Sequence, residues 1–298
     1  MSNTTIYAVD SGSGKLVINT IDSDKISAMP KGLKTFANFN LNDKSYVVGF
    51  DPSAKKAYTF QSQNEKTGEF LNQVSSCDIS FGTTNVETFY LAGRPMLLTY
   101  DPSSEYAQFI EISDTLELIS IYSAKIGKGL STTKPFAYRF GIFFVAYDIE
   151  NGSVNKYQLS VPANQKLYAT KTWSDKWAQG WTRFSFFQLG GENFFIKTNI
   201  KYDKVNIDHF MDDPDESSHP VANIPAPPQM QGLQDVAAFT NKIGNAFFAT
   251  YRDNGEVTFN SIHGNCLGWT DEVQEKAAAG ATTILPFTVG TDNYVLVY

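Results

Sequence analysis

The segment SYVVGFDPSAKKAYTF, residues 45–60, consists of two aromatic-rich apolar stretches joined by an acidic turn, and this arrangement recurs along the chain. Further copies are TIYAVDSGSGKLVINTI (5–21), PMLLTYDPSSEYAQFI (95–110), FFVAYDIENGSVNKYQL (143–159), NFFIKTNIKYDKVNIDHF (193–210), AFFATYRDNGEVTFNSI (246–262) and a truncated NYVLVY (293–298). The first stretch ends roughly every 50 residues, at Phe50, Tyr100, Tyr147, Thr198, Tyr251 and Tyr298. A repeat of this period with β-type sequence in every unit predicts an all-β propeller.

Each unit contains more than the repeated hairpin. One apolar strand and a short polar turn precede six of the copies; these strands are TFANFNL (from Thr35), NVETFYL (Asn85), KPFAYRF (Lys134), RFSFFQL (Arg183), DVAAFTN (Asp235) and TILPFTV (Thr283). A looser fourth strand follows, such as EFLNQVSS from Glu69. Four strands per unit and six first strands predict a six-bladed β-propeller, and the seventh copy of the second strand leaves a seven-bladed ring as the alternative.

The chain ends are expected to meet. The sequence ends after the first and second strands of a blade, and it begins near the second and third strands of a blade. Pairing of the terminal strands would therefore complete one blade. We therefore expect residues 1–298 to form a single propeller domain. Two segments depart from the pattern: 271–281, DEVQEKAAAGA, predicts a short helix, and the proline-rich 211–232 predicts a long exposed connection.

Composition and charge exclude several classes of function. The formal net charge is −7 without a Lys/Arg cluster, which opposes binding to nucleic acid. No apolar run approaches the about 18 residues of a membrane span, and the N-terminus lacks the features of a signal peptide. We therefore expect a cytoplasmic protein with no membrane span. Cys77 and Cys266 lack metal-ligand spacing and are expected to be reduced, buried thiols.

Tryptophan is the first candidate for ligand contact. All four tryptophans, Trp173, Trp177, Trp181 and Trp269, lie in segments interpreted as connections between blades. Gly180-Trp181-Thr182 and Gly268-Trp269-Thr270 look like copies of one element. An indole can stack on a sugar or on an apolar ring, while turn groups such as Asp148 and Asp253 accept hydroxyl protons. The alternative is that the tryptophans fill gaps between blades.

Acidic residues begin most of the repeated turns. Asp10, Asp51 and Asp101, with Asp148 and Asp253, could place carboxylates around a divalent cation such as Ca²⁺ or Mg²⁺. The alternative is ordinary turn chemistry, because an aspartate side chain accepts backbone N–H groups at a turn. His209, Asp213 and His219 are residue types that bind metals and could meet around a second cation, although no fixed spacing relates them. The alternative is that they belong to a loop exposed to solvent.

Known catalytic motifs are absent, since no nucleophile elbow, phosphate loop or dinucleotide fingerprint is complete. The stretch WAQGWTRFSFFQLGGENFFIKTN, residues 177–199, is similar to the repeat of bacterial and fungal propeller lectins of the tectonin and tachylectin type. The architecture also resembles mushroom fruit-body lectins and, more weakly, pigment-carrying fungal chromoproteins. This resemblance implies a non-catalytic protein, not an enzyme, that binds a glycan. The alternatives are a carrier of an apolar small molecule or chromophore and, third, an enzyme with an unfamiliar site near the central channel.

Overall fold

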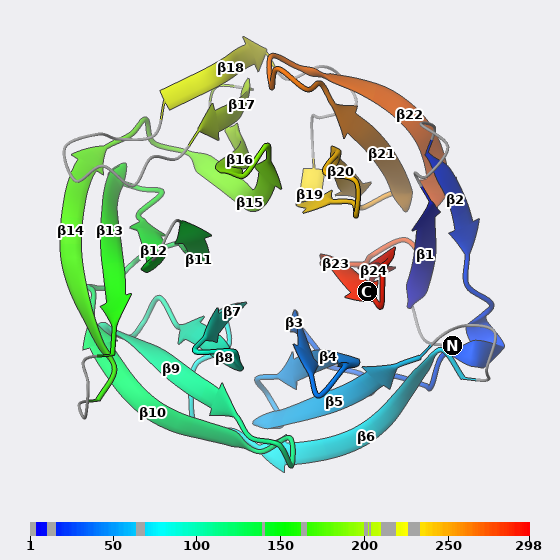
Figure 1. Cartoon of the computed structure of the whole chain (residues 1–298), viewed down its shortest axis with the longest axis horizontal. Helices are drawn as coiled ribbons and strands as arrows, with labels where there is room; N and C mark the ends of the chain where they lie inside the picture. Colours follow the sequence, from blue (N-terminus) through cyan, green and yellow to red (C-terminus); the bar gives the residue numbers. More distant parts are fainter. Residues whose placement is uncertain are drawn as a thin grey trace.

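In the computed structural model, six four-stranded antiparallel sheets surround a central channel (Figure 1). The structure describes residues 4–10, 16–63, 69–138, 141–161, 166–199, 202, 204–209, 219–225 and 233–298. This arrangement confirms the predicted six-bladed β-propeller and removes the seven-bladed alternative. Among the described residues, no helix is long and apolar enough to cross a membrane.

Five blades are formed by consecutive strands, with the first strand innermost. Blade 1 contains β3 (Thr35–Leu41), β4 (Lys44–Asp51), β5 (Lys56–Ser62) and β6 (Leu71–Asp78). Blade 2 contains β7 (Asn85–Leu91), β8 (Arg94–Tyr100), β9 (Tyr106–Ile112) and β10 (Leu118–Lys125). Blade 3 contains β11 (Thr132–Tyr138), β12 (Gly141–Tyr147), β13 (Ser153–Ser160) and β14 (Tyr168–Lys176). Blade 4 contains β15 (Trp181–Leu189), β16 (Glu192–Asn199), β17 (Lys204–His209) and β18 (His219–Pro225). Blade 5 contains β19 (Leu233–Thr240), β20 (Ala246–Arg252), β21 (Glu256–Ile262) and β22 (Trp269–Lys276).

Blade 6 combines both ends of the chain, as the sequence predicts. Its order from the channel outward is β23 (Ile284–Val289), β24 (Asp292–Val297), β1 (Thr5–Asp10) and β2 (Val17–Thr20). The N-terminal strand β1 is thus a third strand and not a second strand, because it pairs with β24 on one side and β2 on the other. This removes the surplus second strand that had allowed seven blades.

The alternating strand directions give the ring two faces. We call the face that carries the turns between second and third strands, and the links from one blade to the next, the connector face. The opposite face, with the first-to-second and third-to-fourth turns, is the hairpin face. A short 3-10 helix, η1 (Ser23–Lys25), lies in the link from blade 6 to blade 1. The predicted helix over 271–281 is wrong, because β22 (Trp269–Lys276) pairs with β21 along its length.

Aromatic side chains pack the boundaries between blades. The ring centroids of Phe109 and Phe144 are 5.8 Å apart across blades 2 and 3, and those of Tyr7 and Phe259 are 5.5 Å apart across blades 6 and 5. The second strands are almost wholly buried, because neighbouring blades cover both of their faces. Their apolar runs therefore do not alternate with polar residues, unlike strands with one solvated face. This use of aromatics accounts for much of the unusual composition.

Candidate functional site

A cavity of about 430 Å³ occupies the connector-face end of the central channel. Its wall is formed by the first residues of all six innermost strands and by the residues that precede them. Five charged side chains line it, one from each of blades 1 to 5: Lys34, Glu87, Lys134, Arg183 and Asp235. Such convergence of ionisable groups in a concave site is the arrangement expected for acid–base chemistry.

Glu87 and Lys134 form an ion pair across blades 2 and 3, from β7 to β11. Their side chains are 29% and 24% exposed, and that exposure is to the cavity that both residues line. Burial raises the pKa of the Glu87 carboxyl, although the Lys134 ammonium acts in the opposite direction. The charge of Asp235 raises this pKa further, so the two carboxyls are electrostatically coupled across the cavity.

Asp235 is fixed by two backbone amides. The N–H of Val236 donates to its Oδ1 at 2.9 Å, and the N–H of Ile284 in blade 6 donates to its Oδ2 at 3.0 Å. Burial raises the pKa of Asp235 and outweighs the lowering by these hydrogen bonds and by the charges of Arg183 and Lys134. The cavity therefore contains two carboxyls whose proton affinity is increased, a common property of catalytic acids and bases.

Arg183 reaches the cavity from a distorted stretch of backbone. Its φ is +48°, in the left-handed region, and the pairing of β15 with β16 shifts register between Thr182 and Phe184. A second shift occurs in the pairing of β19 with β20, between Leu233 and Asp235. The other four innermost strands pair with their neighbours in continuous register. Bulges at strand ends commonly redirect a side chain near a functional site.

The ring places these groups on opposite walls. In Figure 1, β7 lies across the channel from β19, and β3 lies across it from β15. Glu87 on β7 thus faces the wall that carries Asp235, while Lys34, which directly precedes β3, faces the wall that carries Arg183. A small ligand in the cavity would lie between two carboxyls along one direction and between two cations along another.

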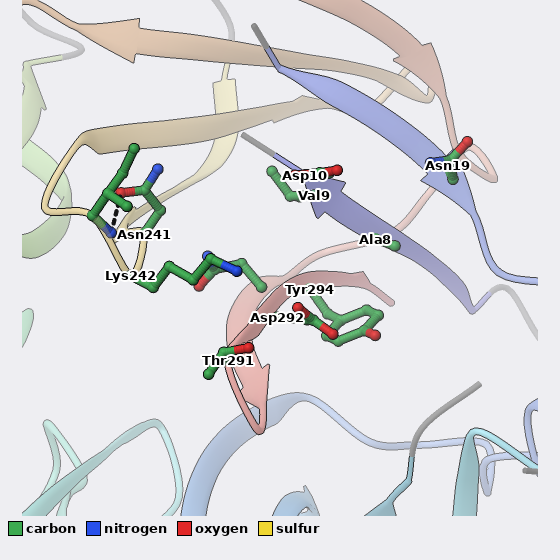
Figure 2. A pocket seen from close by; sticks show the side chains of 11 residues that line it. Ala8, Val9, Asp10, Asn19, Asn241, Lys242, Thr291, Asp292 and Tyr294 are labelled. Atoms are coloured by element: carbon green, nitrogen blue, oxygen red, sulfur yellow. Dashed lines mark hydrogen bonds between the residues drawn. The ribbon is translucent and has the colours of Figure 1, made fainter. Parts of the chain in front are cut away.

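A second hollow lies on the hairpin face between blades 5 and 6 (Figure 2). It has a volume of about 300 Å³ and is lined by Asp10, Asn19, Lys242 and Asp292, among others. Asn241 uses its side-chain oxygen within its own turn, where it accepts the N–H of Asn245 at 2.8 Å. The charged side chains of this hollow, Asp10, Lys242 and Asp292, are all exposed, whereas Glu87 and Lys134 in the channel cavity are partly buried.

The four tryptophans do not share one face. Trp181 begins β15 at the connector face, opposite Asn199 in the ladder, whereas Trp269 begins the outermost strand β22 at the hairpin face, opposite Ile262. The two Gly-Trp-Thr segments are therefore not copies of one element. Trp173 lies within the outermost strand β14. Of the four tryptophans expected in connections between blades, only Trp177 therefore lies in one.

The indoles contact other parts of the core. Trp181 is only 6% exposed, which leaves it no free face for a ligand. The Trp177 ring lies 5.7 Å from the rings of both Tyr147 and Phe195, and Trp269 packs edge-on to Phe248 at 5.4 Å. Trp173 packs in part against the same cluster as Trp177. These contacts agree with the alternative in which tryptophans fill gaps between blades.

The turn aspartates cap their own turns. Oδ1 of Asp51 accepts the N–H groups of Ser53 and Ala54, both at 2.9 Å. Asp101 accepts the N–H of Ser103 at 2.8 Å, and Asp148 accepts that of Glu150 at 2.9 Å. Asp253 is exposed in the β20–β21 turn. This is the local turn chemistry expected of aspartate.

The expected ring of carboxylates is incomplete. Asp10 ends β1 and so lies on the hairpin face, away from the connector-face turns of Asp51 and Asp101. Asp213 lies outside the described residues. His209 and His219 are ladder partners on β17 and β18, and Nε2 of His209 lies 3.3 Å from Oε2 of Glu192. Within the described ranges, no group of three or more His, Cys, Asp or Glu side chains is arranged to hold a metal ion.

The sequence contains a signal for the channel site that motif searches do not detect. Glu87, Lys134, Arg183 and Asp235 each stand in one of the innermost strands recognised from the repeat, close to the start of that strand. A charged side chain among apolar and aromatic neighbours is costly unless it faces a polar cavity. Only the closed ring brings these four positions, spread over roughly 150 residues, to one place.

No family model matches the chain, and no curated protein matches its sequence. Solved structures do match its fold. A periplasmic gluconolactonase of Pseudomonas aeruginosa has a TM-score of 0.59 and 13% identity, covering 99% of this chain and 88% of that one. A candidate 6-phosphogluconolactonase of Bacteroides fragilis has a TM-score of 0.58 and 12% identity, covering 99% and 87%. An exo-β-1,3-galactanase of Phanerochaete chrysosporium has a TM-score of 0.54 and 10% identity, covering 91% and 61%.

These similarities contradict the resemblance to tectonin-type, mushroom-type and chromoprotein propellers. They equally contradict the predictions of a non-catalytic glycan or pigment binder and of a protein that is not an enzyme, since the three structures named above are a gluconolactonase, a candidate 6-phosphogluconolactonase and an exo-galactanase. The resemblance was misleading because aromatic-rich blade sequence reflects packing between blades, which all propellers need whatever they bind. At identities of 13% or less, the likeness shows the fold alone.

Proposed function

We propose that this protein is an enzyme that hydrolyses a small cyclic ester, a lactone, in the channel cavity. The observation that supports this most directly is the pair of carboxyls, Glu87 and Asp235, on opposite walls of one cavity, each close to a cation. The cavity volume of about 430 Å³ accommodates a ring of monosaccharide size. The named activity of the similar gluconolactonase provides the reaction class.

In this proposal Glu87 acts as the general base. Its carboxylate accepts a proton from water as the water oxygen attacks the lactone carbonyl carbon. The Lys134 ammonium, already beside Glu87, stabilises the negative charge that develops on the carbonyl oxygen. Asp235, whose pKa is raised, donates a proton to the ring oxygen as the C–O bond breaks. The product is the open hydroxy acid.

Glycoside hydrolysis is the second candidate. Two carboxyls that flank a cavity are also what this reaction requires, one as acid and the other as base or nucleophile. The likeness to exo-galactanases adds a reason to test it. Lactone hydrolysis ranks first because the Lys134 ammonium beside Glu87 suits an oxyanion, whereas a glycosidic transition state carries positive charge.

The test is hydrolysis of glucono-δ-lactone, followed by proton release in a pH-stat and corrected for the spontaneous rate. Glu87→Gln and Asp235→Asn should each lower kcat by about 10²–10⁴-fold. The matched control is Glu111→Gln, which removes a carboxylate from β9 outside the cavity and should retain the wild-type rate. Far-UV circular dichroism and thermal unfolding confirm that each variant is folded.

Aryl β-galactosides assayed with the same proteins separate the two candidates. Hydrolysis of the galactoside but not of the lactone, abolished by Glu87→Gln, would replace the lactonase proposal by the glycosidase. Equal rates of both substrates in wild type and in Glu87→Gln would reject the channel as the site of either reaction.

A further inference from the structure

The charge of the channel cavity is opposite in sign to that of the whole protein. The chain has a formal net charge of −7, yet the cavity is lined by three cations, Lys34, Lys134 and Arg183, and by two carboxyls. Low-dielectric walls concentrate such a field on a ligand inside the cavity.

The cations of the cavity are not equally available. Lys134 is engaged with Glu87, whereas Arg183 and Lys34 form no ion pair with any residue that the structure describes. Arg183 is exposed and lines the cavity, so its guanidinium donors can reach a ligand there. The charge of Arg183 lowers the pKa of Asp235. A guanidinium in this situation matches the planar geometry of a carboxylate or phosphate group.

The backbone at Arg183 is adapted to present this side chain. A φ of +48° is unfavourable for a non-glycine residue, and the register shift next to it turns the chain out of the regular ladder. The strained strand is anchored to its neighbour: Ser185 Oγ accepts the N–H of Ala238 at 2.7 Å, and Thr240 Oγ1 donates to the carbonyl of Gln188 at 2.7 Å. Strain held in place by such supports is characteristic of ligand-binding positions.

We infer that the substrate carries an anionic group, a carboxylate or a phosphate monoester, and that Arg183 binds this group at the mouth of the channel. Lys34, on the opposite wall, adds to the attractive potential that the anion meets as it enters. This inference rests on the proposed function for the identity of the reaction, but the anion site itself rests on the cavity and on Arg183. Glu87 and Lys134 then act on the part of the substrate that lies deeper among the innermost strands.

The test compares three lactones: neutral glucono-δ-lactone, its 6-phosphate, and the γ-lactone of 2-hydroxyglutarate, which has a free carboxylate. Arg183→Gly removes the guanidinium and also relieves the positive φ, so this variant is expected to fold. Its kcat/KM should fall about 10–150-fold more for the preferred anionic lactone than for the neutral one, mainly through KM. Arg183→Lys should recover part of the loss, since it restores charge without the planar fork. Whichever anionic lactone shows this loss identifies the group as phosphate or carboxylate.

Lys55→Gly is the matched control. Lys55 is also a basic residue with a positive φ, of 53°, but it lies in the β4–β5 turn and does not line the channel. This variant should treat the three lactones as the wild type does. A wild type that prefers the neutral lactone, or an Arg183→Gly variant that loses all three equally, would overturn the inference.

Calorimetric titration with inorganic phosphate separates this inference from the proposed function. Phosphate that binds the wild type but not Arg183→Gly supports the anion site even if no lactone is hydrolysed. Hydrolysis of glucono-δ-lactone that requires Glu87, together with no binding of phosphate or of either anionic lactone, would support the proposed function and reject the anion site.

Discussion

Nζ of Lys197 lies 2.5 Å from Oδ2 of Asp208, and both side chains are almost wholly buried between β16 and β17 of blade 4. The ammonium also lies 4.2 Å from the ring centroid of Trp177 and 4.6 Å from that of Trp181. Burial lowers the pKa of Lys197, while the Asp208 charge opposes this. Two of the four tryptophans proposed from sequence as ligand contacts, Trp177 and Trp181, thus lie against a buried ion pair.

Removal of one partner of this pair should be more damaging than removal of both. Lys197→Met leaves the Asp208 carboxylate buried without its cation, which costs about 3–5 kcal/mol of unfolding free energy. The double variant Lys197→Met/Asp208→Leu should recover much of that loss, because no charge remains buried. Urea titrations followed by tryptophan fluorescence measure the three proteins. A double variant that is no more stable than Lys197→Met would show that the loss does not come from an unpaired, buried Asp208 carboxylate.

The recurring tyrosine at the end of the second strand joins successive blades. The hydroxyl of Tyr251 donates to the carbonyl of Ala278 at 2.9 Å and accepts the N–H of Ala281 at 2.9 Å, in the link from blade 5 to blade 6. Tyr251→Phe should therefore lower the unfolding free energy by about 1–3 kcal/mol, since the buried N–H of Ala281 and the partly buried carbonyl of Ala278 lose their partner. Tyr58→Phe, in the half-buried middle of β5, is the control and should change it by less. Denaturant midpoints provide the comparison.

The acid limb of the pH–rate profile should lie above the ordinary pKa of glutamate. A base works only when ionised, and burial raises the pKa of Glu87, so activity is lost as pH falls through that raised value. Lys134→Met removes the charge that lowers this pKa, so the limb should move to higher pH as well as losing rate. Measurement of kcat/KM against pH for both proteins tests this. A limb that moves to lower pH in Lys134→Met would contradict the assignment of Glu87.

Closure of the ring depends on a strand of six residues. β1 is hydrogen-bonded to β24 and β2, and Ile6 and Tyr7 are fully buried. Deletion of residues 1–10 should expose the edge of β24 and the core of blade 6, with a loss of cooperativity in thermal unfolding and a tendency to aggregate. Deletion of residues 1–3 is the control. Circular dichroism melting and light scattering would detect the difference; a ten-residue deletion that melts like the wild type would show that the ring does not need this strand.

The repeat made most of the scaffold predictable from sequence. The expected innermost strands TFANFNL and NVETFYL coincide with β3 and β7, because their boundaries are set by local turn residues and apolar pattern. The segment 271–281 was misread for the opposite reason. Its Ala, Glu and Lys content favours a helix locally, but the free edge of β21 offers a ladder that satisfies its backbone.

The candidate site was harder to foresee. Each of Glu87, Lys134, Arg183 and Asp235 is a single charged residue in its own strand. The four positions recur at about the repeat period, but no local motif marks them as one site. Sequence periodicity reports which face of a strand is buried, but in an innermost strand it does not distinguish a packed surface from the wall of a cavity. Asp10 was grouped with Asp51 because their local sequences are alike, although the pairing of β1 as a third strand puts it on the other face.

Local residue patterns in this chain specify the strands and the turns, since each depends on neighbours within one repeat, and the repeat predicts a propeller whose two ends meet. The choice of six blades over seven required the strand pairing, in which β1 is a third strand. The placement of charge depends on closure. Residues that are equivalent in the repeat are held about a sixth of a turn apart around the axis, so only the assembled ring sets β7 opposite β19. Glu87, Asp235 and Arg183, on β7, β19 and β15, thereby line one cavity. Burial by the surrounding blades then raises the pKa of Glu87 and of Asp235, and no single strand could produce this effect.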